Sequence, residues 1–257
     1  MVAVEKELFY PAITYIILNY IFNINKKMPE LISPNANCQV CGASLDGKAL
    51  LEFKNMPAAA QHLPDAGSLK DDAGESLIVS QCPGCGLVQL KNQPVPHYRE
   101  VLRAAAISSD MKEFRLRQLS DFIRKYSLSR KKVIEIGCGR GEYLSIISRL
   151  DLEARGLEYA KDSVDQCLAN GLKASVGFVE DENYKIDGAP FDAFFMLNFL
   201  EHLPSPKAAL KGINNNLEDG AVGIIEVPNF DMILKKKLFS EFINDHLFYF
   251  TKDTLET

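Results

Sequence analysis

The feature that most constrains the fold is the alternation of strand-like and helix-like segments between residues 131 and 228. Apolar segments as long as a buried strand are separated by helical patterns of about ten residues, which predicts βαβ units around a parallel sheet. We therefore expect a doubly wound α/β fold. Its five strands are expected in KKVIEIG, EARGLEY, LKASVG, FDAFFMLNFL and GAVGIIEVP.

The chain divides into four regions. Residues 1–27 form an apolar N-terminal extension, and residues 28–95 form a small module of short strands and turns. Residues 96–126 have a helical pattern and form a linker, and residues 127–257 form the α/β domain. The small module has too few apolar residues for a core of its own, so we expect another element to stabilise it.

The N-terminal extension contains a largely apolar stretch, residues 8–24, that Pro11, Asn19 and Asn23 interrupt. Its length is at the lower end of the range for a membrane span. Two glutamates precede it, where a secretory signal would carry positive charge. These features favour a peripheral amphipathic helix, or a non-native start with Met28 as the true initiator, and a membrane anchor is the alternative.

Four cysteines occur as two matched CxxCG motifs, Cys38 with Cys41 and Cys82 with Cys85. A CxxC turn brings two thiolates close enough for one tetrahedral metal ion. We predict a four-thiolate structural zinc site that stabilises the small module. An iron–sulfur cluster and four cysteines in a small core are the alternatives. Reduced thiolates indicate the cytoplasm.

A glycine-rich turn, in VIEIGCGRGEYL, lies between a buried strand and a helix. Gly137, Gly139 and Gly141 allow the backbone to approach a ligand closely at the N-terminus of the helix. The spacing is GxGxG, and Glu142 stands where a dinucleotide-binding motif has its last glycine. Glu135 ends the strand, where it would repel phosphates and suit a cationic ligand.

Glu158 ends the second predicted strand, where a carboxylate can accept hydrogen bonds from two ribose hydroxyls. A nucleoside with a positive charge and no phosphate describes S-adenosylmethionine. We therefore predict a site for this cofactor, with Asn198, near the end of the fourth predicted strand, among its binding residues.

With these motifs in view, residues 112–257 resemble the class I S-adenosylmethionine-dependent methyltransferases, whose first motif matches EIGCGRG. The resemblance implies that Glu135, Gly137 and Gly139 line the methionine part and that Glu158 holds the ribose. The segment from CQVCG to CPGCGLVQL resembles the zinc-binding domain of sugar-nucleotide C-methyltransferases, and NDHLFYFT is similar to their EHxxxFS segment. This implies a small-molecule acceptor such as a nucleotide-linked sugar.

The sequence departs from that family at three points. Ile243 stands where the family has a catalytic tyrosine, and a second tyrosine expected in the linker has no match in EVLRAAAISSDM. The resemblance also implies an antiparallel hairpin after the fifth strand, whereas this sequence ends at Thr257. We therefore expect a sheet without its last strands, and methyl transfer to oxygen or nitrogen rather than carbon.

Two of the four histidines are candidates for catalysis. His246 and His202 are predicted general bases near the transferred methyl, because imidazole titrates near neutral pH. His62 and His97 have no ligand spacing and are expected at the surface.

The predicted function is methyl transfer from S-adenosylmethionine to a small molecule by a cytoplasmic enzyme with a zinc module. A non-catalytic binding protein of the same fold is the main alternative, because of the missing hairpin. Glu135 and Glu142 argue against an NAD-dependent oxidoreductase. The 29 Lys and Arg against 34 Asp and Glu give a net charge of −5, which argues against nucleic acid or an anionic membrane as partner.

Overall fold

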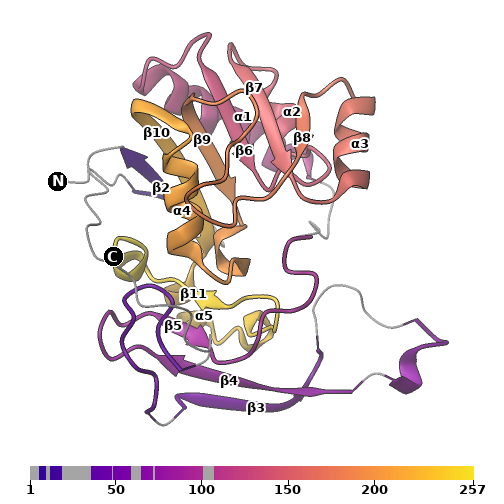
Figure 1. Ribbon diagram of the computed structural model, residues 1–257, viewed down its shortest axis with the longest axis vertical. Helices are drawn as coiled ribbons and strands as arrows, with labels where there is room; N and C mark the ends of the chain where they lie inside the picture. Colours follow the sequence, from indigo (N-terminus) through magenta and orange to yellow (C-terminus); the bar gives the residue numbers. More distant parts are fainter. Residues whose placement is uncertain are drawn as a thin grey trace.

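The computed structural model describes residues 36–47, 49–58, 65–71, 73–100 and 107–257 with their side chains, and the backbone of residues 6–9 and 12–18. His62, which is predicted to lie at the surface, is outside the described residues. Two sheets organise the chain, one in the upper and one in the lower part of Figure 1. Within the described part of the chain, no helix is long and apolar enough to cross a membrane.

The larger sheet has seven strands in the order β1–β2–β10–β9–β6–β7–β8. The last five of these run parallel to one another, which confirms the predicted parallel α/β sheet. Their bounds are β6 Lys132–Ile136, β7 Glu153–Glu158, β8 Ala174–Val176, β9 Phe191–Leu197 and β10 Leu217–Pro228.

Helices cover both faces of this sheet. They are α1 Ser109–Lys125, α2 Leu144–Ile147, α3 Lys161–Ala169 and α4 Pro206–Asn214. In β9, Ala193, Phe195 and Leu197 belong to the apolar cluster that includes α1, α2 and α3, whereas Phe194 and Met196 belong to the cluster that includes α4. A strand buried on both faces is a continuous apolar run, which explains why FDAFFML was recognisable.

The helical linker expected over residues 96–126 is shorter in the structure. Helix α1 begins after Ser108, whose hydroxyl accepts a hydrogen bond from the Met111 amide at 3.1 Å. Residues 96–99 form turns, and residues 101–106 lie outside the described chain. The helix therefore begins where a capping side chain satisfies its first amides.

The edge of the sheet beyond β10 carries two antiparallel strands from the N-terminal extension. Strand β2 (Ala12–Leu18) pairs with residues 222–228 of β10, and β1 (Lys6–Phe9) pairs with β2 (Figure 1). The expected peripheral helix is wrong for these residues, because they are strands. The position beside the fifth parallel strand is thus occupied by a segment from the other end of the sequence.

The smaller sheet is antiparallel, in the order β11–β5–β4–β3. Its strands are β3 Leu51–Met56, β4 Glu75–Gln81, β5 Val88–Leu90 and β11 Phe248–Tyr249. Helix α5 (Phe230–Lys236) packs Phe230 and Ile233 in the same apolar cluster as these strands. The strands of the cysteine module therefore pair and pack with the C-terminal segment. The bounds of the module, residues 28–95, stay a prediction.

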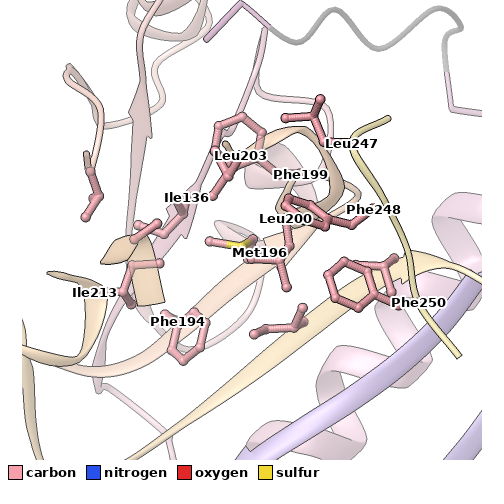
Figure 2. Close-up of a cluster of buried hydrophobic side chains, with 14 of the residues drawn as sticks. Ile136, Phe194, Met196, Phe199, Leu200, Leu203, Ile213, Leu247, Phe248 and Phe250 are labelled. Atoms are coloured by element: carbon pink, nitrogen blue, oxygen red, sulfur yellow. The ribbon is translucent and has the colours of Figure 1, made fainter. Parts of the chain in front are cut away.

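A shared hydrophobic cluster joins the two parts of the molecule. Leu247 and Phe248 of the C-terminal segment lie in one cluster with Phe199 and Leu200, which follow β9 (Figure 2). The Leu247 amide also donates to the Glu201 carbonyl at 2.9 Å. This packing holds the segment before β11 against the carboxyl end of the parallel sheet. The remaining helical turns in the described chain are η1 Leu69–Asp71, η2 Leu200–His202, η3 Phe239–Glu241 and α6 Lys252–Leu255.

Candidate functional site

Two matched turns present the four cysteines predicted to bind metal. In each turn the glycine amide, of Gly42 or Gly86, donates to the carbonyl of the first cysteine, Cys38 or Cys82, at 2.9 Å. Both glycines have a left-handed backbone, with φ of 78° and 79°. Glycine adopts this conformation at little cost, which explains the CxxCG pattern.

The four Sγ atoms form a cluster of the size of a tetrahedral thiolate site. The Sγ atoms of Cys38 and Cys85 are 3.7 Å apart, those of Cys41 and Cys82 are 3.4 Å apart, and all four lie within 4.8 Å of one another. A Zn–S bond of about 2.3 Å corresponds to an edge of about 3.8 Å in a tetrahedron of sulfur atoms. The cluster therefore fits a zinc ion.

Hydrogen bonds in the second turn favour ionisation of one thiol. Burial by itself raises the pKa of Cys82, but the amide of Cys85, the thiol of Cys41 and the amide of Gly84 lower it to about 7. Burial raises the pKa of Cys85 and of Cys41. Four thiols this close can all ionise only when a cation offsets their charge, so the cluster is suited to a metal ion.

The glycine turn after β6 has a left-handed backbone at its glycines. Gly137 and Gly141 have φ of 69° and 88°. A Cβ at Gly137 would lie 2.8 Å from the ring of Phe199, and a Cβ at Gly141 would lie 2.5 Å from Leu172. These two glycines therefore make room for side chains of this chain.

Two buried carboxylates flank the glycine turn. Glu135 is the last residue but one of β6 and is 1% exposed, and Glu158 ends β7 and is 3% exposed. The carboxylate of Glu158 accepts hydrogen bonds from the amides of Gly139 and Ala160, both at 2.9 Å. Each carboxylate oxygen has two lone pairs, so it can accept from a backbone amide and from a ligand hydroxyl together. Two buried negative charges at the carboxyl ends of neighbouring strands suit a cationic nucleoside.

Asn198 directly follows β9 and is held by Glu226 of β10. Its Nδ2 donates to Oε1 of Glu226 at 3.1 Å, and its backbone amide donates to the Glu226 carbonyl at 2.7 Å. The φ of Asn198 is 52°, a left-handed conformation that asparagine tolerates. The structure thus places Asn198 at the carboxyl edge of the sheet, with its side chain fixed by a carboxylate.

Glu226 forms a buried ion pair with Arg115 of α1, which was not predicted from the sequence. Nη1 of Arg115 donates to Oε2 of Glu226 at 2.6 Å, and Nη2 donates to Oε1. Both side chains are 4% exposed, and Gln118 also accepts from Arg115 at 2.7 Å. The one sequence signal was a glutamate within the apolar strand GIIEVP. Its partner lies 111 residues earlier, where no local pattern reveals it.

The two predicted catalytic histidines lie in contact. The ring centroids of His202 and His246 are 4.8 Å apart in an edge-to-face arrangement. Nδ1 of His202 donates to the carbonyl of Asp245 at 2.8 Å. Burial lowers the pKa of His202 to about 4, and burial beside His202 lowers the pKa of His246 well below its ordinary value. Both imidazoles are therefore neutral at pH 7, and His246 is the one that is partly exposed.

His97 joins this group, which corrects its expected surface position. Its Nε2 lies 3.3 Å from Oδ1 of Asp245, and its side chain is 19% exposed. Asp245 is 1% exposed, so the carboxylate is shielded from water on its other sides. Three of the four histidines thus gather at the carboxyl end of β9. Residue spacing in the sequence could not reveal that His97 belongs to this group, because its partner Asp245 is 148 residues away.

Cys138 and Cys167 lie beneath the glycine turn. Both are fully buried, with Sγ atoms 3.8 Å and 3.5 Å from the Gly139 carbonyl. They fill the space between the turn and α3, which favours a packing role.

The sequence matches a methyltransferase-domain family over residues 111–257, more than half of the chain. The chain therefore belongs to this methyltransferase-domain family. The ubiquinone biosynthesis O-methyltransferase of Chromobacterium violaceum is 29% identical over 107 residues, which are 39% of this chain and 46% of the relative. That of Xylella fastidiosa strain M23 is 26% identical over 110 residues, 39% of this chain and 43% of the relative. The match spans less than half the length of these curated relatives.

Among solved structures, the plantazolicin methyltransferase BpumL in complex with S-adenosylhomocysteine (SAH) is 17% identical, with a TM-score of 0.45 over 57% of this chain and 63% of that chain. DesVI from Streptomyces venezuelae is 18% identical, with a TM-score of 0.39 over 45% of this chain and 50% of that chain. The fold assignment rests on the observed sheet order and on the family match.

Proposed function

We propose that this chain transfers a methyl group from S-adenosylmethionine to a small-molecule acceptor. The observation that carries the proposal is the glycine turn between Glu135 and Glu158, in a chain of the methyltransferase-domain family. The carboxylate of Glu158 would accept hydrogen bonds from the ribose hydroxyls. Glu135, Gly137 and Gly139 would line the methionine part, where the negative charge of Glu135 attracts the sulfonium.

We assign the acceptor to the carboxyl edge of the sheet, beside the partly exposed His246. An electron pair of the acceptor forms the new bond to the methyl carbon while the bond from sulfur to that carbon breaks, and its electron pair stays on sulfur to give S-adenosylhomocysteine. As general base, His246 would take up the proton that the acceptor loses. His202 would position His246 through the edge-to-face contact of their rings. Alignment of the two reactants can account for about 7–11 kcal/mol of the barrier.

The class of acceptor follows from two different considerations. The resemblance of the cysteine module favours a nucleotide-linked sugar. The names of the curated relatives favour oxygen as the attacked atom, and Ile243 in place of a tyrosine argues in the same direction. A sugar hydroxyl satisfies both considerations.

We further propose that the cysteine cluster binds one structural zinc ion in a cytoplasmic protein. Four thiolate ligands complete a tetrahedral shell, so the ion would stabilise the module and take no part in methyl transfer.

Calorimetry with S-adenosylmethionine, S-adenosylhomocysteine and NAD tests the proposed cofactor. We expect both sulfur compounds to bind and NAD to give no heat. Turnover of a panel of nucleotide sugars with labelled methyl donor then tests the reaction. Cofactor binding without transfer to any acceptor would favour the non-catalytic binding protein instead.

A further inference from the structure

We infer that Glu201, His202 and His246 form a second metal site, for a divalent first-row transition metal bound by nitrogen and oxygen. One ligand atom from each of the three residues lies within 4.8 Å of the other two. Two imidazoles and one carboxylate are ligands that manganese, iron, cobalt and zinc accept. This site is separate from the cysteine cluster, which offers only sulfur.

The hydrogen bonds around His202 prepare it to bind a metal. A carbonyl oxygen can only accept, so Nδ1 of His202 must donate to the carbonyl of Asp245 across their 2.8 Å separation. The neutral ring then carries its lone pair on Nε2, which lies 3.9 Å from Oε1 of Glu201. Fixing a ligand histidine through its other nitrogen is the usual arrangement at metal sites.

The distances suit a single ion. Metal–ligand bonds of about 2.0–2.2 Å allow two ligand atoms to be at most about 4.3 Å apart. The separation between Nε2 of His202 and Oε1 of Glu201 is within this limit. All three ligand atoms lie within 4.8 Å of one another, so a shift of the His246 ring by about 0.5 Å would bring the set within this limit.

The surrounding charges also suit a divalent cation. Glu201 and Asp245 are each 1% exposed, and together their carboxylates offset two positive charges. Nε2 of His97 lies 3.3 Å from the carboxylate of Asp245. The backbone hydrogen bond from Leu247 to Glu201 and the apolar cluster of Figure 2 fix the two segments that supply the ligands.

Three protein ligands leave coordination positions open for a small molecule. This step rests on the proposed function. The open positions would receive a hydroxyl oxygen of the methyl acceptor. When the cation is bound, His246 would serve as its ligand and not as the base. The cation would lower the pKa of that hydroxyl, and the proton would pass to water.

Manganese binding tests the site, followed by electron paramagnetic resonance on protein that holds a single equivalent of zinc, which the four thiolates retain. Thiolate clusters select softer metals than Mn²⁺, and zinc gives no signal. We expect about one Mn²⁺ per wild-type chain. Glu201→Gln and His246→Gln should each weaken its affinity at least about tenfold, because even second-sphere changes cost that much. Glu218→Gln, which alters an exposed carboxylate at the start of β10, should bind Mn²⁺ like the wild type.

Absence of Mn²⁺ binding by folded wild-type protein, or unchanged binding by His246→Gln, would overturn the inference. If the buried Glu201 variant fails to fold, His246→Gln decides the matter. Calorimetry with S-adenosylhomocysteine in the absence of Mn²⁺ separates this result from failure of the proposed function. The cofactor should bind equally well to the wild type and to His246→Gln.

Discussion

The buried ion pair between Arg115 and Glu226 predicts a large effect of a single substitution on stability. Arg115→Met leaves the carboxylate of Glu226 buried without its cation, although Asn198 still donates to it. Breaking one partner of a buried pair typically costs about 3–5 kcal/mol. For a chain of this size the melting temperature should fall by roughly 6–20 °C, at about 2–4 °C per kcal/mol.

Far-ultraviolet circular dichroism during urea and thermal unfolding measures this change. Arg117→Ala is the matched control, because Arg117 pairs with Glu113 on the exposed face of the same helix. An exposed pair of this kind contributes about 0.3–0.5 kcal/mol. The control should therefore unfold close to the wild type.

A double variant distinguishes loss of the pair from loss of packing. Arg115→Met with Glu226→Leu removes both charges, and such replacements are often neutral or stabilising. We expect it to be more stable than Arg115→Met. A loss below about 1 kcal/mol for Arg115→Met, or no recovery in the double variant, would refute the reasoning.

Three further predictions concern the cysteine cluster, the cofactor and the acceptor. Purified protein should contain about one zinc per chain. Cys38→Ser should unfold the cysteine module, because metal binding supplies folding energy in such modules. Reduced, folded protein without zinc or iron would contradict this prediction. Glu158→Ala should weaken S-adenosylhomocysteine binding by about 1.5–3 kcal/mol in calorimetry, whereas Glu153→Ala, an exposed residue at the other end of β7, should not. His246→Ala should lower turnover by about 10²–10⁴-fold with nearly unchanged cofactor binding, and full turnover would mean that His246 only packs.

Local sequence patterns revealed the parallel strands and the two chemical motifs. Strand β9 is apolar on both faces, and the CxxCG motif contains its own turn, so each can be recognised from a few consecutive residues. The pairs Arg115–Glu226 and His97–Asp245 could not be recognised in this way, because each joins residues more than one hundred positions apart.

The same reason explains why strands such as β2 and β11 were not foreseen. An apolar segment such as AITYIIL predicts a buried strand, a helix or an anchor, and only its neighbour decides among them. The short β11 has two residues and no alternating pattern of its own. Its conformation depends on pairing with β5 and on the apolar cluster around Phe248.

The pairing of β2 with β10 has a consequence during synthesis of the protein. Leu18 is opposite Val222, so the N-terminal strand leaves the ribosome long before its partner. At about 5–20 residues per second, the delay is roughly 10–40 s. Throughout this interval an apolar strand has exposed edges that can pair with another nascent chain. Expression yield should therefore depend on chaperones that bind this segment early, and on the rate at which the ribosome reaches β10.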